Sequence, residues 1–262
     1  MRELSVAQYR KILSILESNT RTTTFAYAVC DQTIDGKVFV NEELTAGLII
    51  TANGIYYVFG DTQDKSYNED LFLYIKTAIE KTEKRFTLFT SSEEWEMMLE
   101  ERFSNVLRKI PRMKFQRVTF EERKRDCNKN TYEVKRIDRR DIERSNEFTQ
   151  AYYKEYWGSN EAFLNDGFGF CIEQNGMIVA ECVSIFSGNG FAEIDIVTHE
   201  AHQGKGLAQA VATRFIEHCI QNDITPCWDC YVDNIPSQKL ASKLSFHHPI
   251  EYSLFVRKRT GE

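Results

Sequence analysis

Apolar residues in the first half of the chain recur at helical spacing in some segments and form strand-like runs in others. The predicted helices cover residues 3–18, residues 68–81 and the stretch from Ser91 and Ser92 to about Phe103. The predicted strands cover residues 24–30, 86–89 and 113–120. Asn68 is the expected N-cap of the second helix. Asn53-Gly54 stands between two apolar runs, so residues 46–60 are expected to form a hairpin.

The second half alternates strand and helix patterns more regularly. Predicted strands cover residues 132–137, 168–173, 177–186, 191–198, 226–232 and 250–257. Predicted helices cover residues 138–157, 206–221 and 237–244. Asn175-Gly176 is expected to turn the second and third of these strands into a hairpin.

The almost wholly polar stretch 121–131 separates the two halves. We place a domain boundary there, with an N-terminal α/β domain at residues 1–125 and a second domain at residues 126–262. A long surface loop within one fold explains the same pattern equally well.

A glycine loop between a predicted strand and a predicted helix is the most informative segment. Glycines at 204 and 206 allow a ligand to approach the backbone, and the N-terminus of the following helix attracts anions. A P-loop would need glycine at position 199, which is His199, and a dinucleotide fingerprint would need glycine or alanine at position 209, which is Gln209. The pattern therefore indicates a diphosphate site of another kind.

Gln203, Gly206 and Ala208 fit the pattern Gln/Arg-x-x-Gly-x-Gly/Ala, and the chain here resembles the GNAT acetyltransferase superfamily. The segment from Asn234 to Phe246 is similar to the family's Asn-x-x-Ala/Ser-x-x-Leu…Leu-Gly-Phe segment. More narrowly, the tract that begins at Glu193 resembles the branch containing the zwittermicin A resistance acetyltransferase.

The resemblance implies an α/β (α+β) fold, in which a mixed, mostly antiparallel sheet splays at the cofactor strand and is flanked by helices. We expect a smaller N-terminal α/β domain to precede it and to complete or cover the acceptor site, although no residue of the first half indicates a role. Acetyl-CoA would be the co-substrate, and an amine would attack its thioester directly in a ternary complex. The implied cofactor-binding residues are Ile196, Val197 and Thr198 for the pantetheine, Gln203, Gly204, Lys205, Gly206, Leu207 and Ala208 for the diphosphate, and Asn234 and Ser237 near either.

Two carboxylates on one predicted strand are candidates for removing a proton from the amine. Glu193 and Asp195 are two residues apart, so both side chains point to one face unless a bulge intervenes. A solvent-facing or ion-paired strand explains the same spacing. Many family members have a tyrosine where this chain has Ala241, so the proton donor to the leaving thiolate would be another residue, or water, or be absent. Tyr231 is a candidate and Tyr252 a weaker one, although packing of a strand tyrosine explains either residue more readily.

Composition limits the partners. The net charge of −6 and the pI near 5.6 argue against a nucleic-acid partner and favour a small-molecule amine. No stretch has the length and apolar character of a membrane span, and seven cysteines without a secretion signal indicate the cytoplasm. The Cys227-x-x-Cys230 pair lacks a second pair, so no metal is expected. The chain is expected to be a monomer or a homodimer.

Other functions remain open at this point. A non-catalytic acyl-CoA-binding or regulatory module would keep the loop, and Ala241 favours it. A protein-interaction domain without a cofactor would show no thermal shift with acetyl-CoA. The aromatic run Tyr152-Tyr153-x-x-Tyr156-Trp157 fits either an acceptor pocket or helix packing.

Overall fold

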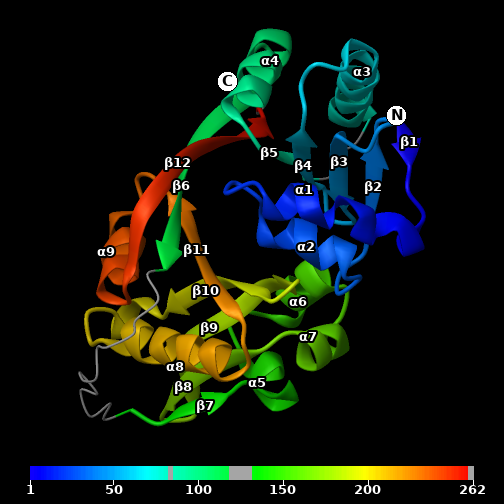
Figure 1. Ribbon diagram of the computed structural model, residues 1–262. Helices are drawn as coiled ribbons and strands as arrows, with labels where there is room; N and C mark the ends of the chain where they lie inside the picture. Colours follow the sequence, from blue (N-terminus) through cyan, green and yellow to red (C-terminus); the bar gives the residue numbers. More distant parts are fainter. Residues whose placement is uncertain (82–84, 118–131, 259–262) are drawn as a thin grey trace. The chain divides into compact units, whose positions relative to one another are not determined.

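The computed structural model describes residues 1–81, 85–117 and 132–258. The chain divides into two compact units (Figure 1). The first unit comprises Met1–Met113 and Ile250–Glu262, and the second comprises Lys114–Pro249. The boundary predicted near residue 125 lies outside the described residues, and the predicted domain limits stay a prediction.

The sheet of the first unit is mostly antiparallel. Its strands, in spatial order, are β1 (Arg2–Glu3), β2 (Gly36–Val40), β3 (Ala46–Thr51), β4 (Ile55–Gly60), β5 (Thr87–Thr90) and the part of β12 (Phe246–Arg257) from residue 250 onward. Only the β4–β5 pair is parallel among these strands. The predicted hairpin is confirmed, with Gly54 at a φ of +84° in its turn.

Helices surround this sheet, and one of them corrects a prediction. The unit contains η1 (Val6–Ile12), α1 (Leu13–Glu17), α2 (Thr24–Cys30), α3 (Lys65–Lys81) and α4 (Glu93–Phe103), followed by β6 (Leu107–Arg117). The strand predicted at residues 24–30 is wrong, because this run forms α2. All seven side chains of α2 are buried. A helix that is apolar all round suits such a site, and packing overrides the β-propensity of its residues.

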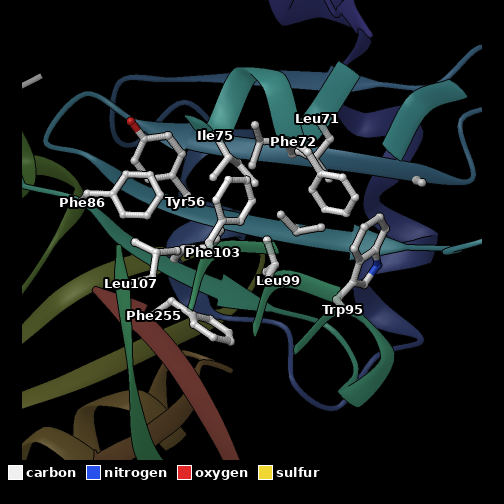
Figure 2. Close-up of a cluster of buried hydrophobic side chains, with 14 of the residues drawn as sticks. Tyr56, Leu71, Phe72, Ile75, Phe86, Trp95, Leu99, Phe103, Leu107 and Phe255 are labelled. Atoms are coloured by element: carbon white, nitrogen blue, oxygen red, sulfur yellow. The ribbon is translucent and has the colours of Figure 1, made fainter. Parts of the chain in front are cut away.

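The core of the first unit lies between the sheet and the helices α3 and α4 (Figure 2). Trp95 of α4 is fully buried, and its indole N–H donates to the carbonyl of Gly60 at 2.9 Å. The predicted cap of α3 is wrong: Asn68 lies within the helix, and Asp64 accepts the N–H of Tyr67 at 3.0 Å. Ser92 caps α4 as predicted.

The sheet of the second unit is also mostly antiparallel. In spatial order its strands are β11 (Thr225–Tyr231), β10 (Phe191–Thr198), β9 (Met177–Gly188), β8 (Gly169–Gln174) and β7 (Val134–Arg136). Only β10 and β11 are parallel among them. The β8–β9 hairpin is confirmed, and both Asn175 and Gly176 have positive φ.

Helices cover both faces of this sheet. They are α5 (Arg139–Arg144), α6 (Gln150–Trp157), α7 (Asn160–Asp166), the short η2 (Glu200–His202), α8 (Leu207–Gln221) and α9 (Ile235–Lys243). Residues 138–157 were predicted to be mostly helical and to end near Gly158, and this is confirmed, although two helices share the segment. The chain leaves the helix at Ser145, whose ψ is 135° and whose Oγ accepts the N–H groups of Glu147 and Phe148.

Ring contacts assign the two faces. Phe168 and Phe170 pack against Phe215 and His218, so α8 covers their face of the sheet. Side chains on the opposite face meet α6 and the turn before it, where Tyr152 bonds to Asp195 (β10).

The two units repeat one topology, although their sequences share no motif. Each has three antiparallel strands, a helix, a fourth strand parallel to the third, and another helix: β2-β3-β4-α3-β5-α4 and β8-β9-β10-α8-β11-α9 (Figure 1). The predicted fold class, mixed α/β with a mostly antiparallel sheet flanked by helices, is confirmed.

Candidate functional site

The parallel strands β10 and β11 separate partway along their length. Their Cα pairing ends at Glu193 and Cys227, although β10 continues to Thr198 and β11 to Tyr231. On its other side β10 remains paired with β9 through Thr198. In the described part of the chain, the ladder between β10 and β11 does not extend to residues 196–198, which is the predicted splay of the two strands.

The glycine loop follows this splayed end. Gly206 is the N-cap of α8, and no side chain caps the helix. Gly204 and Gly206 have φ values of +75° and +81°, and a Cβ at either would meet no atom within 4 Å. Residues 203–206 are exposed. In the part of the chain that the structure describes, the backbone N–H groups of residues 204–208 have no acceptor. Exposed donors at a helix N-terminus fit a diphosphate.

Side chains tie this loop down through its carbonyl groups. Gln203 Nε2 donates to the carbonyl of Thr198 at 3.3 Å, and Lys205 Nζ donates to that of Ala201 at 3.1 Å. The Tyr132 hydroxyl donates to the carbonyl of Lys205 at 3.1 Å. These three carbonyl groups are thus engaged, while the donors of residues 204–208 stay available. Tyr132 was not singled out from the sequence, since no spacing relates it to the loop.

The equivalent place in the first unit differs in its strand pairing and in its helix start. There β4 pairs with β5 up to Thr90, the end of β5. Asp61 and Asp64 lie in the loop before α3 and accept the N–H groups of Gln63 and Tyr67, both at 3.0 Å. Carboxylates of the protein itself occupy the start of α3. An anion can therefore bind at the loop before α8 but not at the loop before α3.

Residues at the end of β11 and the start of α9 have structural contacts of their own. Asn234 caps α9 by accepting the N–H of Ser237 at 3.1 Å, and Ser237 Oγ accepts from the indole of Trp228 at 3.0 Å. Tyr231 ends β11 with 45% of its surface exposed. Ala241 is buried in α9. Because β10 and β11 are parallel, α8 and α9 begin at the same edge of the sheet.

The two candidate carboxylates share one face of β10. The register shifts between Glu193 and Ile194, where β9 carries an extra residue, so β10 itself keeps its alternation. Ile194 is buried on the other face. Glu193 pairs with Phe186, whose ring packs against Tyr156 of α6 at 5.8 Å. Glu193 and Asp195 therefore both lie on the face that α6 covers.

Asp195 has a partner that the sequence did not reveal. The Tyr152 hydroxyl donates to Asp195 Oδ2 at 2.9 Å. Burial, followed by the charge of Asp195, raises the pKa of Tyr152 well above its usual range. The Tyr152 ring packs on Phe148 at 4.6 Å, while the neighbouring Tyr153 is buried against Phe163 at 4.3 Å. The aromatic run thus combines core packing with one polar contact to the candidate site.

Glu181 of β9 is a third carboxyl on the same face, and sequence reasoning missed it. It is buried, and its Oε2 accepts from Ser145 Oγ at 2.6 Å. Its Oε1 is buried without a partner among the described residues. Burial raises the pKa of Glu181 to about 7. Because Ser145 also binds the N–H of Phe148, Glu181 helps to hold the turn before α6.

Several other sequence candidates fall elsewhere. Cys230 is buried and Cys227 is partly exposed, with its Sγ 3.7 Å from the carbonyl oxygen of Thr225. Tyr252, the weaker candidate for the proton donor, is buried in the first unit with its ring 6.2 Å from that of Phe89. Within the described ranges, no group of three or more His, Cys, Asp or Glu side chains forms a metal site. No described helix has the length and apolar character needed to cross a membrane.

Comparison with known proteins gives a consistent result. A sequence model of the family described as GNAT acetyltransferase matches residues 14–255. The chain is 36% identical over 257 residues to the uncharacterized N-acetyltransferase YdfB of Bacillus subtilis (strain 168), which covers 97% of this chain and 98% of that protein.

Two solved structures share the fold along nearly the whole chain. A GCN5-related N-acetyltransferase-like protein from Streptococcus suis 89/1591 aligns with a TM-score of 0.70 and 22% identity, over 96% of this chain and 99% of that one. A tandem GNAT protein from the clavulanic acid biosynthesis pathway aligns with a TM-score of 0.62 and 10% identity, over 100% and 98%. Since the family match spans most of its length, the chain belongs to the GNAT acetyltransferase family.

Proposed function

We propose that the protein transfers the acetyl group of acetyl-CoA to a primary amine of a small molecule, by direct attack of the amine in a ternary complex. The observation that carries this proposal is the exposed loop before α8, whose backbone donors at residues 204–208 have no described acceptor. Its position at the splayed end of β10 and β11 adds support. Acetyl-CoA supplies the activated thioester when it is bound.

Each part of the site has a proposed task in binding. Backbone N–H groups of residues 204–208 hold the diphosphate, with the N-terminus of α8 behind them. The edge of residues 196–198 holds the pantetheine as an added strand would be held. Asn234 and Ser237 lie at the same edge of the sheet and flank the bound molecule.

Glu193 is the proposed proton acceptor. The amine must lose a proton to attack, and a carboxylate within reach can accept it directly or through water. Asp195 lies on the same face, but its Oδ2 already accepts a hydrogen bond from Tyr152 at 2.9 Å. The proposed task of Asp195 is therefore to hold a cationic amine. Tyr231 is the proposed proton donor to the leaving thiolate.

The absence of the family's usual tyrosine supports one rival proposal. Position 241 is a buried alanine, which carries no proton to donate. A non-catalytic acyl-CoA-binding or regulatory module would tolerate this change. Coenzyme A is a tolerable leaving group, so the loss of this acid is compatible with catalysis as well.

A coenzyme A release assay over polyamines, aminoglycosides and amino acids distinguishes the two proposals. We expect turnover with at least one amine, and Glu193→Gln should lower kcat/KM by about 10²- to 10⁴-fold without changing coenzyme A affinity. Glu217→Gln is the control, since Glu217 lies on the exposed side of α8 and pairs with Arg214. Binding of acetyl-CoA without turnover on any amine would favour the rival, and full activity of Glu193→Gln would exclude Glu193 as the base.

The narrower expectations belong to the same proposal. The resemblance to the zwittermicin A branch supports an aminated antibiotic or metabolite as the acceptor. Net charge of −6 supports a cationic partner over a nucleic acid. The seven cysteines support the cytoplasm as the compartment. A monomer or a homodimer is the proposed assembly.

A further inference from the structure

The peptide plane between Lys205 and Gly206 carries one of the backbone donors of the loop. Lys205 stands between two glycines with positive φ, and neither glycine has an atom within 4 Å of the place where a Cβ would lie. Packing therefore contributes little to the orientation of this plane. The hydroxyl of Tyr132 contacts it from 73 residues away, at 3.1 Å from the carbonyl oxygen of Lys205.

The geometry of a trans peptide connects this contact to the anion site. The carbonyl of one residue and the N–H of the next point in opposite directions in a planar trans peptide, and no described peptide bond is cis. A hydroxyl that holds the Lys205 carbonyl on one side therefore turns the Gly206 N–H to the other side. That N–H is one of the donors for which the structure describes no acceptor.

The position of Tyr132 is itself supported by the sheet. Tyr132 lies two residues before β7, in which Val134 pairs with Ile172 of β8. Ile172 is two residues from Phe170 and shares its face, and Phe170 packs against His218 of α8. The edge strand β7 thus belongs to the sheet that α8 covers, and the contact of the Tyr132 hydroxyl with the Lys205 carbonyl lies two residues before α8 begins.

We infer that Tyr132 is a positioning residue for the diphosphate: its hydroxyl holds the Lys205 carbonyl and so keeps the Gly206 N–H directed at the anion. This rests on the proposed function, in which the loop receives the diphosphate of coenzyme A. The contribution of Tyr132 is specific to ligands that carry a diphosphate. It does not extend to the pantetheine arm, which the strand edge holds.

The test is Tyr132→Phe, which removes one hydroxyl from a partly exposed side chain. Binding of coenzyme A and of pantetheine, which lacks the diphosphate, is measured by calorimetry. We expect the Kd for coenzyme A to rise about three- to tenfold, as for the loss of one neutral hydrogen bond. The Kd for pantetheine should be unchanged. Tyr9→Phe is the matched control, because the Tyr9 hydroxyl also donates to a backbone carbonyl, that of Gly36, at 3.1 Å in the first unit. It should leave both Kd values unchanged.

Two results would overturn the inference. One is an unchanged Kd for coenzyme A in Tyr132→Phe. The other is an equal loss for both ligands, with or without a lower melting temperature, which would make Tyr132 a general structural residue. If wild-type protein bound no coenzyme A, the proposed function would fail with the inference. If wild-type protein bound it and Tyr132→Phe bound it equally well, the inference alone would fail.

Discussion

Replacing Gly206 with alanine tests whether the left-handed conformation of the loop is needed for binding. Gly206 has a φ of +81°, and an added Cβ would meet no atom within 4 Å. The cost is therefore conformational and not steric, about 1–2 kcal/mol for a left-handed L-residue. The loop of the ligand-free variant can relax to avoid this cost. Binding of coenzyme A must then restore the left-handed conformation, so the Kd for coenzyme A should rise about 5- to 30-fold.

The chain contains two matched controls for this change. Gly158, after α6, and Gly176, in the β8–β9 turn, also have positive φ and open space around the missing Cβ. Gly158→Ala and Gly176→Ala should lose a similar free energy of unfolding in urea but keep the wild-type Kd measured by calorimetry. The reasoning would be refuted if Gly206→Ala bound coenzyme A as tightly as wild type, or if all three variants lost affinity equally.

Two further changes test the surroundings of the site. Burial raises the pKa of Glu181 from 4.5 to about 7. Between these two pH values the native state keeps a proton that the unfolded state releases. The stability of the wild type therefore falls as the pH rises from 4.5 to about 7. Glu181→Gln lacks this loss, and the difference between the two unfolding free energies should change by about 3 kcal/mol from pH 4 to pH 8; equal differences at both pH values would contradict the assignment. Asn234→Asp keeps an equally good N-cap for α9 and should unfold at the same urea concentration as wild type. Its added negative charge should weaken coenzyme A binding if position 234 flanks the cofactor. Unchanged affinity would show that Asn234 acts only as the cap of α9.

Local chemistry explains which elements could be predicted. Asn175-Gly176 and Gly54 determine hairpins through backbone conformations that few other residues adopt, and both turns were predicted correctly. The loop before α8 was predicted in the same way, because its glycines, the preceding strand and the following helix are adjacent in the sequence. The prediction of a strand at residues 24–30 was wrong because a short apolar run suits a strand or a buried helix equally. Only its tertiary surroundings decide which of the two forms.

The contacts that complete the site join residues that are distant in sequence. Tyr152 reaches Asp195 across 43 residues, and Tyr132 reaches Lys205 across 73. No periodicity encodes such pairs, since they depend on which helix covers which face of the sheet. The repeated topology was also invisible, because the loop of the first unit carries Asp61 and Asp64 where the second has glycines.

A titration of isotope-labelled protein with coenzyme A, followed by amide NMR, tests the central claim most directly. The backbone N–H groups of residues 204–208 should show the largest shift changes, at one coenzyme A per chain, while residues 61–64 before α3 stay unchanged. Shift changes centred on residues 61–64, or none at residues 204–208 when the ligand is saturating, would contradict the account.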